Sequence, residues 1–307
     1  MSGRETRPPL LLVGGSGGLV GRSIPPAFGR RFRIHSLHRT LVPQERATGI
    51  EWIPADAGQP LRWESLVTPQ TTVLNLAWYR WGPESAFREL YEGLSRLLEA
   101  SVRVGVRRFL HVSVPEAPPQ LEQQLPYLTY KRRFDRKLQE SGLSYRVLRP
   151  SMLFGPGDRL LRVMTRMIRR YRRFPMFGEG EYRLSPLAAA DLARILAAQA
   201  FSREDGVLDV GGPVSYAYRE LTDLIFRSLG LRPRYWHLSA RGALRLVRLL
   251  RLFGSRILYP YEVEWLMSGR LALPPYLSID PPLQRVDSYL ADLSRGGAAK
   301  SAGNGWG

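Results

Sequence analysis

Short apolar runs alternate with amphipathic stretches along the first half of the chain. The runs that predict buried strands cover residues 10–13, 32–37, 50–53, 72–77, 108–113 and 145–148. From 83 to 104 the large apolar side chains recur every three or four residues, which predicts an amphipathic helix, and a second helix is expected over about 127–140. Strands that alternate with helices at this spacing predict parallel β–α–β units and an α/β fold.

The pattern changes after Pro150. Residues 151–158 are rich in Gly and Pro, and a very basic helix is expected after them. Further elements are predicted as helices over 191–200, 218–229, 239–253 and about 260–268, and as a strand over 207–210. The last residues, 296–307, are small and polar and are expected to form a flexible tail. The second half therefore predicts a separate and mostly helical region.

The composition narrows the class of protein. The 307 residues are 44% apolar and 23% charged, which is a globular composition with enough material for a core. The absence of cysteine excludes disulfide frameworks, thiolate metal sites and cysteine nucleophiles. The four histidines (His35, His38, His111 and His237) lack metal-ligand spacing, so no metal site is expected. A polar N-terminus and the lack of an apolar run of about 18 residues lead us to expect a cytoplasmic protein.

The charge is strongly basic and almost entirely carried by arginine. Lysine and arginine number 45 against 27 acidic residues, a formal net charge of +18, and only three of these cations are lysines. A net charge of +11 lies within residues 131–173. Residues 239–256 alternate Arg with Leu, Val and Phe, which indicates either a packed helix with a solvated Arg face or peripheral contact with an anionic membrane. No nucleic-acid module is recognised, so specific nucleic-acid binding is not expected.

A glycine-rich turn follows the first predicted strand. Gly15, Gly18 and Gly21 form the pattern G-x-x-G-x-x-G, which suits a tight strand-to-helix turn whose backbone approaches a pyrophosphate. Pro25 and Pro26 fall inside the helix expected after the turn, so this helix is predicted to break near Ile24.

The cofactor preference is predicted from the end of the second strand. A dinucleotide site places an acid there for the ribose hydroxyls of NAD, or an Arg for the 2′-phosphate of NADP. The sequence has Arg39 at this point and no acid. Arg39, together with Arg22, therefore slightly favours NADP(H) over NAD.

Several segments together resemble a known family. They are Leu11–Gly21, Asp56, Leu74–Ala77, Gly105–Ser113, Pro126–Lys131, Leu148–Asp158, Pro186–Asp191 and Gly211–Pro213. They resemble the extended, atypical branch of the short-chain dehydrogenase/reductase superfamily. Within that branch they are similar to the epimerase/dehydratase-like group that includes the dinucleotide-binding accessory subunit of mitochondrial complex I. The resemblance covers about residues 9–230.

The resemblance implies a fold, a domain division and a cofactor site. The fold is a Rossmann-type doubly wound parallel sheet over residues 1–153, with 189–213 returning to it, and a smaller, mostly helical substrate domain over 154–295. The implied cofactor is NAD(P). The implied cofactor-binding residues are Gly15, Ser16, Gly18, Leu19, Val20, Gly21, Asp56 on the adenine side, Ala77 along the groove, and Pro150 near the nicotinamide.

Tyr127 and Lys131 are the predicted reaction residues. They form Y-x-x-x-K, and residues four apart lie on one face of a helix. An adjacent ammonium favours the phenolate of a tyrosine that must exchange a proton near neutral pH. In the family the Lys also bonds the nicotinamide ribose. Ser113 is the candidate third catalytic residue, although the family often places this hydroxyl one position later, where the chain has Val114.

Three other polar or aromatic residues in these segments receive structural interpretations. Asp191 is interpreted as a helix N-cap, Tyr130 as a groove or surface aromatic, and His111 as a packed strand residue.

Two functions follow from these residues. The first is an NAD(P)-dependent oxidoreductase or epimerase/dehydratase that moves a hydride to or from a carbonyl or alcohol. Its small-molecule substrate would be phosphorylated, a nucleotide-sugar or lipid-like, because the chain is basic. The second is a non-catalytic NAD(P)H-binding sensor or assembly subunit of a membrane-associated complex, since Val114 stands where the family often has a hydroxyl.

Overall fold

The computed structural model describes residues 7–15, 17–38, 50–55, 57–58, 60–239, 241–245, 247 and 259–295. These residues divide into two compact units. Unit 1 comprises the described residues up to Val114, together with Pro119–Arg149 and Ala190–Leu208. Unit 2 comprises Pro115–Pro118, Pro150–Ala189 and the described residues from Asp209 onward. The assignment of substrate binding to the second unit stays a prediction.

Unit 1 is built on a seven-stranded sheet. Its strands are β1 (Pro9–Val13), β2 (Arg33–His38), β3 (Ile50–Pro54), β4 (Thr72–Asn75), β5 (Arg108–Val112), β6 (Tyr145–Pro150) and β11 (Gly206–Val210). Their order across the sheet is β11-β6-β5-β4-β1-β2-β3, and the neighbouring pairs from β6 to β3 are parallel. The predicted Rossmann-type α/β fold is therefore confirmed.

The order of the strands reverses beside β1. From β1 the chain moves outward through β2 and β3, then returns to the opposite side of β1 with β4 and continues through β5 to β6. In open parallel sheets, ligands bind outside the carboxyl ends of the strands at such a reversal. The topology therefore directs attention to the residues that follow β1 and β4.

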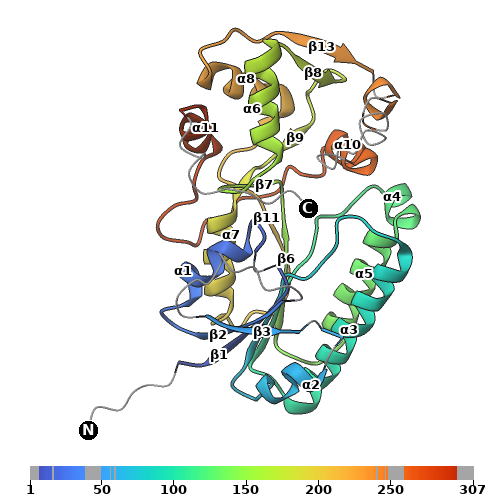
Figure 1. Cartoon of the computed structure of the whole chain (residues 1–307), viewed down its shortest axis with the longest axis vertical. Helices are drawn as coiled ribbons and strands as arrows, with labels where there is room; N and C mark the ends of the chain where they lie inside the picture. Colours follow the sequence, from blue (N-terminus) through green and yellow to red (C-terminus); the bar gives the residue numbers. More distant parts are fainter. Residues whose placement is uncertain are drawn as a thin grey trace. The chain divides into compact units, whose positions relative to one another are not determined.

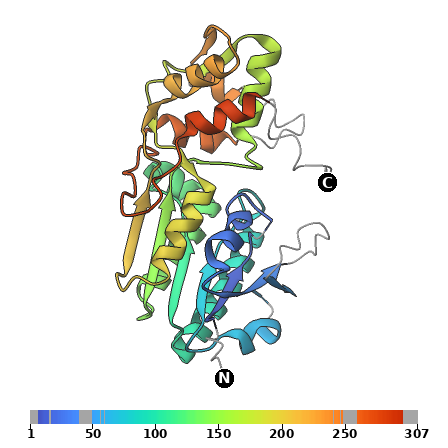
Figure 2. The same cartoon turned by 90° about the vertical axis from the view of Figure 1, so that its left-hand side faces the viewer.

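Helices cover both faces of the sheet in unit 1. The helical elements are η1 (Gly21–Ser23), α1 (Ile24–Phe28), α2 (Pro60–Trp63), η2 (Glu64–Leu66), α3 (Glu84–Val104), α4 (Pro119–Gln124), α5 (Pro126–Gln139) and α7 (Ala189–Gln199). α3 and α5 pack on one face, and α1 and α7 lie on the other (Figures 1 and 2). Leu94, Leu97 and Leu98 of α3 are buried beside Phe134 and Leu138 of α5, as the apolar pattern predicts.

Pro25 and Pro26 lie at the start of α1. The glycine-rich turn passes into the 3₁₀ turn η1, and α1 begins at Ile24, so both prolines fall in its first turn. Backbone N–H groups in a first turn have no partner within the helix, and proline is tolerated there. The break predicted near Ile24 is thus the point at which the 3₁₀ turn becomes the helix.

Unit 2 combines short strands with helices. Its strands are β7 (Leu153–Phe154), β8 (Phe174–Phe177), β9 (Arg183–Leu184), β10 (Leu187–Ala188), β12 (Tyr216–Ala217) and β13 (Tyr235–Leu238). Its described helices are α6 (Leu160–Tyr171), α8 (Tyr218–Ser228), α10 (Pro260–Met267) and α11 (Val286–Ser294). The core includes Leu161 and Ile168 of α6, Ile225 and Phe226 of α8, and Leu290 of α11.

Two predictions fall largely or wholly outside the described residues. They concern the helix over 239–253, of which the structure describes only 239, 241–245 and 247, and the tail 296–307. No helix in the described part of the chain combines the length and apolarity that crossing a membrane requires.

Candidate active site

The turn after β1 brings bare backbone against the segment after β4. Gly14 and Gly15 adopt positive φ angles of 66° and 68°. A Cβ on Gly14 would lie 2.5 Å from the Cβ of Ala77, and one on Gly15 would lie 2.9 Å from the Cβ of Leu76. Only glycine meets both the conformation and the close approach. The sequence of the turn is therefore fixed by the way β1 and β4 meet.

The rest of the turn leaves backbone groups facing solvent. The Gly18 N–H donates to the Gly15 carbonyl at 2.8 Å, and both residues are exposed. Leu19 and Val20 are half-buried and lead into the buried Gly21. Exposed amides in a glycine turn that enters a helical segment form a concave surface suited to an anion. The turn thus has exposed backbone, and the contacts of Gly15, Gly18, Leu19, Val20 and Gly21 with a pyrophosphate stay predictions.

One cation lies beside this turn. The Arg22 Nε donates to the carbonyl of Gly17 at 3.1 Å. Ser16, Arg39 and Asp56, which the sequence predicted to bind the cofactor, lie outside the described residues. Their roles stay predictions, as does the role of Pro150, a buried residue at the end of β6.

Helix α5 presents both predicted reaction residues. It begins at Pro126, whose ring suits the first helical position, so Tyr127 and Lys131 are four residues apart on one helix. Tyr127 is half-buried, with its ring centroid 6.2 Å from that of Phe87 on α3. The Nζ of Lys131 lies 4.5 Å from the ring centroid of Trp78, in the segment after β4. The structure thus places Lys131 beside the carboxyl end of β4.

Lys131 is an unusual lysine because it is buried. Only 3% of its surface is exposed. Burial lowers the pKa of its ammonium to about 7. The negative charge of Asp135 raises this pKa, but its effect is smaller than that of burial. A lysine whose pKa is near neutrality exchanges its proton readily at physiological pH.

Ser113 follows β5 and points into the protein. Its hydroxyl donates to Asp135 Oδ2 at 2.7 Å, and only 2% of the residue is exposed. Its backbone N–H donates to the Leu148 carbonyl of β6 at 2.7 Å. The structure therefore shows a Ser113 hydroxyl held by a carboxylate, while its predicted contact with substrate stays a prediction.

Asp135 is the centre of a buried polar network. His111 Nε2 lies 3.3 Å from Asp135 Oδ1, close enough for electrostatic attraction although poorly aligned for a hydrogen bond. Burial alone would raise the pKa of Asp135, but His111, Ser113 and Lys131 outweigh it and lower this pKa to about 2. The carboxylate is therefore charged, and the Lys131 ammonium interacts with it electrostatically.

Asn75 sets the tautomer of His111. The Asn75 Oδ1 accepts the Ala77 N–H at 2.9 Å, so its amide nitrogen faces His111 Nδ1 at 3.0 Å. The amide nitrogen donates, which leaves His111 Nδ1 as the acceptor and puts the imidazole hydrogen on Nε2, toward Asp135. Burial lowers the pKa of His111, so the ring is neutral. The network thus extends from β4 through β5 to α5.

Two arginines complete the surroundings of Asp135. Arg132 Nη1 donates to Asp135 Oδ2 at 3.2 Å and to the Val114 carbonyl at 2.9 Å. Arg149 Nη2 lies 3.8 Å from the same carboxylate oxygen. Arg132 and Arg149 therefore hold the Asp135 carboxylate in place relative to Lys131 and Ser113.

The sequence contains a local signal for this network. Asp135 is four residues after Lys131, and His111 and Ser113 alternate on the same side of β5. His111 is buried, as predicted, but it is also part of the polar network. Tyr130 is not a surface aromatic: 7% of it is exposed and its hydroxyl donates to Glu84 at 3.2 Å.

Asp191 is not an N-cap. Helix α7 begins at Ala189, so Asp191 lies within the first turn, and Arg194 donates to its Oδ1 at 2.6 Å. An acid in the first turn still complements the helix dipole. Among the described residues, no group of three or more His, Asp or Glu side chains is arranged to hold a metal ion.

Comparisons with known proteins match both the sequence and the fold of this chain. The profile of the NAD dependent epimerase/dehydratase family matches residues 11–211. An accessory subunit of complex I from Arabidopsis thaliana, NADH dehydrogenase [ubiquinone] 1 alpha subcomplex subunit 9, is 26% identical over 94 residues. That match covers 29% of this chain and 23% of the subunit, so it spans less than a quarter of that relative.

Solved structures of similar fold include sugar-nucleotide epimerases. A nucleoside-diphosphate-sugar epimerase from Staphylococcus aureus superposes with a TM-score of 0.72 at 17% identity, over 92% of this chain and 99% of that one. A UDP-N-acetylglucosamine 4-epimerase from Methanobrevibacter ruminantium, in complex with UDP-N-acetylmuramic acid, superposes with a TM-score of 0.68 at 14% identity. This match covers 96% of this chain and 99% of that one. The UDP-glucose 4-epimerase of Thermus thermophilus, in complex with NAD, superposes with a TM-score of 0.59 at 17% identity. This match covers 85% of this chain and 98% of that one.

Proposed function

The chain belongs to the NAD dependent epimerase/dehydratase family, and from this premise we propose that it is an NAD(P)-dependent oxidoreductase or epimerase/dehydratase. Its turn at Gly15, Gly18 and Gly21 binds the pyrophosphate, and Ala77 lines the groove beside it. Arg22, together with Arg39, favours NADP(H), since a guanidinium suits a 2′-phosphate.

The buried Lys131 carries this proposal. An ammonium that is 3% exposed and has a pKa of about 7 is costly to the free protein, and such perturbed groups concentrate at functional sites. Its position beside the end of β4, at the reversal of the strand order, suits contact with the ribose of a bound dinucleotide. The Asp135 network supports this role because it holds a charged carboxylate near the ammonium.

The chain's residues would handle the proton of the reaction. A bound nicotinamide supplies the acceptor or donor of the hydride. When an alcohol is oxidised, its carbon loses a hydride and Tyr127 takes the hydroxyl proton; in the reverse direction Tyr127 returns that proton to the carbonyl oxygen. Lys131 would stabilise the phenolate form of Tyr127, which is present before Tyr127 takes the substrate proton and again after it returns that proton. Ser113 would hold the substrate oxygen only if its hydroxyl exchanged Asp135 for the substrate.

The substrate class we propose is a nucleotide-sugar, a phosphorylated compound related to the ligands named for the structural neighbours. A strongly basic chain favours such anionic substrates over neutral ones.

The hydrogen bond from Ser113 to Asp135 favours a second function, the binding of NAD(P)H without catalysis. The Ser113 hydroxyl is bound by Asp135, and the next position, Val114, has no hydroxyl. A chain that binds NAD(P)H without turning over a substrate, as a sensor or an assembly subunit, would have no need of a free hydroxyl at this position.

Replacing Tyr127 with Phe tests the proposal. The ring and its contact with Phe87 remain, but the proton-exchanging oxygen is lost, so turnover of UDP-glucose or UDP-N-acetylglucosamine should fall by about 100-fold or more. Binding of NADPH and NADH, followed by the fluorescence of the dinucleotide, should be unchanged. The matched control is Tyr130→Phe on the same helix, which should retain turnover.

Equal turnover by Tyr127→Phe and the unaltered chain would remove Tyr127 from the mechanism. NADH binding by the unaltered chain without turnover of any nucleotide-sugar would favour the second function. No binding of either dinucleotide would reject both.

A further inference from the structure

Two basic segments without acidic residues meet in unit 2, where a strand of one pairs with a strand of the other. Residues 159–178 contain seven arginines and no Asp or Glu, and residues 224–261 contain eight arginines and no Asp or Glu. β8 belongs to the first segment and β13 to the second, and the two strands pair in parallel from Tyr235 opposite Phe174 to Leu238 opposite Phe177. The pairing therefore concentrates positive charge at one end of unit 2.

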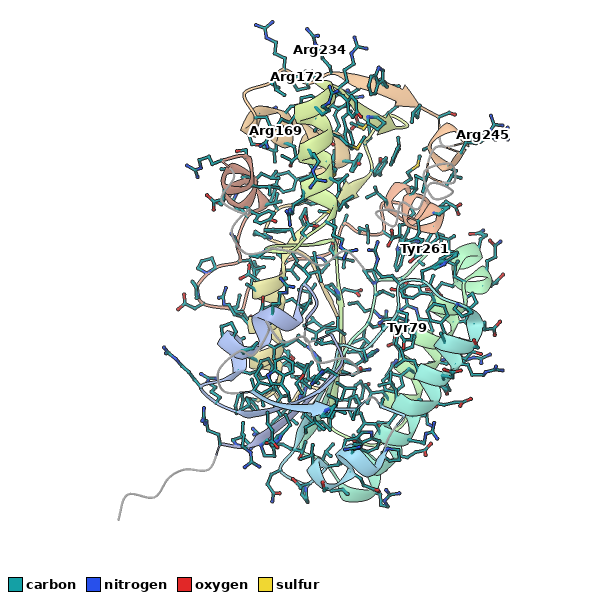
Figure 3. The ribbon with its side chains drawn as sticks, in the orientation of Figure 1. Tyr79, Arg169, Arg172, Arg234, Arg245 and Tyr261 are labelled. Atoms are coloured by element: carbon teal, nitrogen blue, oxygen red, sulfur yellow. The ribbon has the colours of Figure 1, made fainter. Side chains whose placement is uncertain are left out.

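Five arginines at this end are exposed. Arg170, Arg172 and Arg173 lie where α6 ends and β8 begins, and Arg232 and Arg234 lie just before β13. The Phe174 N–H donates to the Arg234 carbonyl at 3.0 Å, which ties the two groups together. Figure 3 shows Arg172 and Arg234 projecting from the same end. In the described part of the chain, none of these five pairs with a carboxylate.

Two large aromatic side chains are exposed among these arginines. Tyr171 is 56% exposed and Trp236 is 45% exposed. The Arg170 guanidinium lies 5.5 Å from the centroid of the Tyr171 ring, and that of Arg173 lies 6.0 Å from the centroid of Trp236. Stability of the fold does not require this arrangement, because exposed aromatic rings and unpaired cations contribute little to packing.

We propose that this basic-aromatic end, comprising the five arginines with Tyr171 and Trp236, binds the surface of an anionic lipid bilayer. Cationic side chains are attracted to acidic headgroups, and Trp and Tyr prefer the headgroup level because each joins an apolar ring to a polar group. The long apolar stem of arginine also suits this level, where its guanidinium can meet phosphate.

A nucleic acid fits the same surface less well. Neither segment contains Asn or Gln, the amides that read base edges, and an arginine already lies over each exposed ring that could stack on a base.

The location differs from the segment that the sequence suggested. Within residues 239–256, Ala243 and Val247 are buried against Phe177 and Val263 of the same unit, while Arg241 and Arg245 are exposed. The described start of that segment is therefore a packed helix with a solvated Arg face. The bilayer surface lies instead at the paired strands and the end of α6.

Co-sedimentation of the full chain with vesicles tests the proposal. The chain should bind vesicles of phosphatidylcholine and phosphatidylglycerol in equal parts, bind phosphatidylcholine vesicles weakly, and lose binding as salt is added. The double variant Arg172→Glu with Arg234→Glu should bind the anionic vesicles at least about 25-fold more weakly, from about fivefold per arginine. Trp236→Ala should also weaken binding, although it leaves the charge unchanged.

The matched control is Arg96→Glu with Arg136→Glu, two exposed residues of unit 1 that change the net charge equally. This control should bind nearly as well as the unaltered chain, and all variants should keep the same far-ultraviolet circular dichroism. Equal binding by the two double variants would overturn the proposal. So would failure of the unaltered chain to bind anionic vesicles, or binding of DNA in preference to them. NADH binding plays no part in these outcomes, so they are independent of the proposed function.

Discussion

Lys131 and Asp135 show how burial has opposite consequences for two charges on one helix. The Lys131 ammonium faces an indole ring and has a single nearby carboxylate, so burial prevails and its pKa falls to about 7. Asp135 is also buried, but its carboxylate accepts hydrogen bonds from the Ser113 hydroxyl and from Arg132. The His111 ring lies beside it, and the pKa of Asp135 falls to about 2. A group surrounded by donors keeps its charge, whereas a group with few partners tends to lose it.

Asp135 and Asp158 should respond differently when each is replaced by Asn. Asp135→Asn removes a paired buried charge and should lower the free energy of unfolding by about 3 kcal/mol near neutral pH. Asp158 Oδ1 and Oδ2 accept the backbone N–H groups of Leu160 and Leu161 at 2.9 and 3.0 Å, and Asn keeps one of these two acceptors. Asp158→Asn should therefore lower this free energy by only about 1 kcal/mol, the cost of one hydrogen bond. Urea unfolding of both variants measures the difference.

The pH dependence of the two effects should also differ in sign. The lowered pKa of Asp135 gives stability above the unfolded value that is lost only as pH falls through about 2. Burial raises the pKa of Asp158 to about 6, so its stabilisation belongs to the protonated form and is lost as pH rises through that value. The free energy of unfolding of Asp158→Asn, relative to that of the unaltered chain, should therefore rise as pH increases from about 4 to 7. The opposite trend, or a harmless Asp135→Asn, would contradict these protonation states.

At the level of elements, a close approach in unit 1 joins α3 to the loop after β3. A Cβ on Gly93 of α3 would lie 2.8 Å from the backbone N of Gly58 and 3.0 Å from the carbonyl carbon of Ala57. The helix therefore lies directly on the backbone of this loop. The same loop contains Asp56, which is predicted to contact the adenine, so α3 supports the segment next to that residue.

Gly93→Ala should destabilise the protein despite the better helix propensity of alanine. The propensity gain is about 1 kcal/mol, but the new methyl group would lie closer to the backbone of Ala57 and Gly58 than van der Waals contact allows, so this backbone must shift at a cost of about 1–3 kcal/mol. Gly82→Ala is the control, since its Cβ would lie at an ordinary 3.6 Å from Ala86. In thermal unfolding, Gly93→Ala should have a lower Tm than the unaltered chain, whereas the Tm of Gly82→Ala should be unchanged. A rise in the Tm of Gly93→Ala would show that α3 is not packed this closely.

The order of the elements in unit 1 could be predicted because each buried strand and amphipathic helix leaves a local pattern. Their ends were less predictable. The strand expected over 72–77 stops at Asn75, because the Asn75 side chain accepts the Ala77 N–H and turns the chain. The buried network was not predicted, since Asn75, His111 and Asp135 lie on three elements that become neighbours only in the folded sheet. Tyr127 and Lys131 were found because their spacing is local to one helix.

For the molecule as a whole, the abundance of arginine changes how each cation is interpreted. Only three lysines stand beside 42 arginines, so an arginine at any given position carries little information, whereas a buried lysine requires an explanation. Lys131 is buried, and Lys137 on the same helix is paired with Glu99 at the surface. Five of the arginines gain meaning from their joint placement at the end of unit 2, rather than from their number.

The central claim is that Lys131 belongs to a dinucleotide site, and the scarcity of lysine makes a direct test practicable. With lysine labelled by carbon-13 at the ε position, the NMR spectrum contains signals from only three residues, which Lys131→Arg and Lys137→Arg assign. We predict that the Lys131 signal titrates near pH 7 in the free protein and that NADPH or NADH shifts this titration upward, since bound phosphate and ribose stabilise the ammonium. A Lys131 signal that titrates at the ordinary value for lysine and responds to neither NADPH nor NADH would contradict the account.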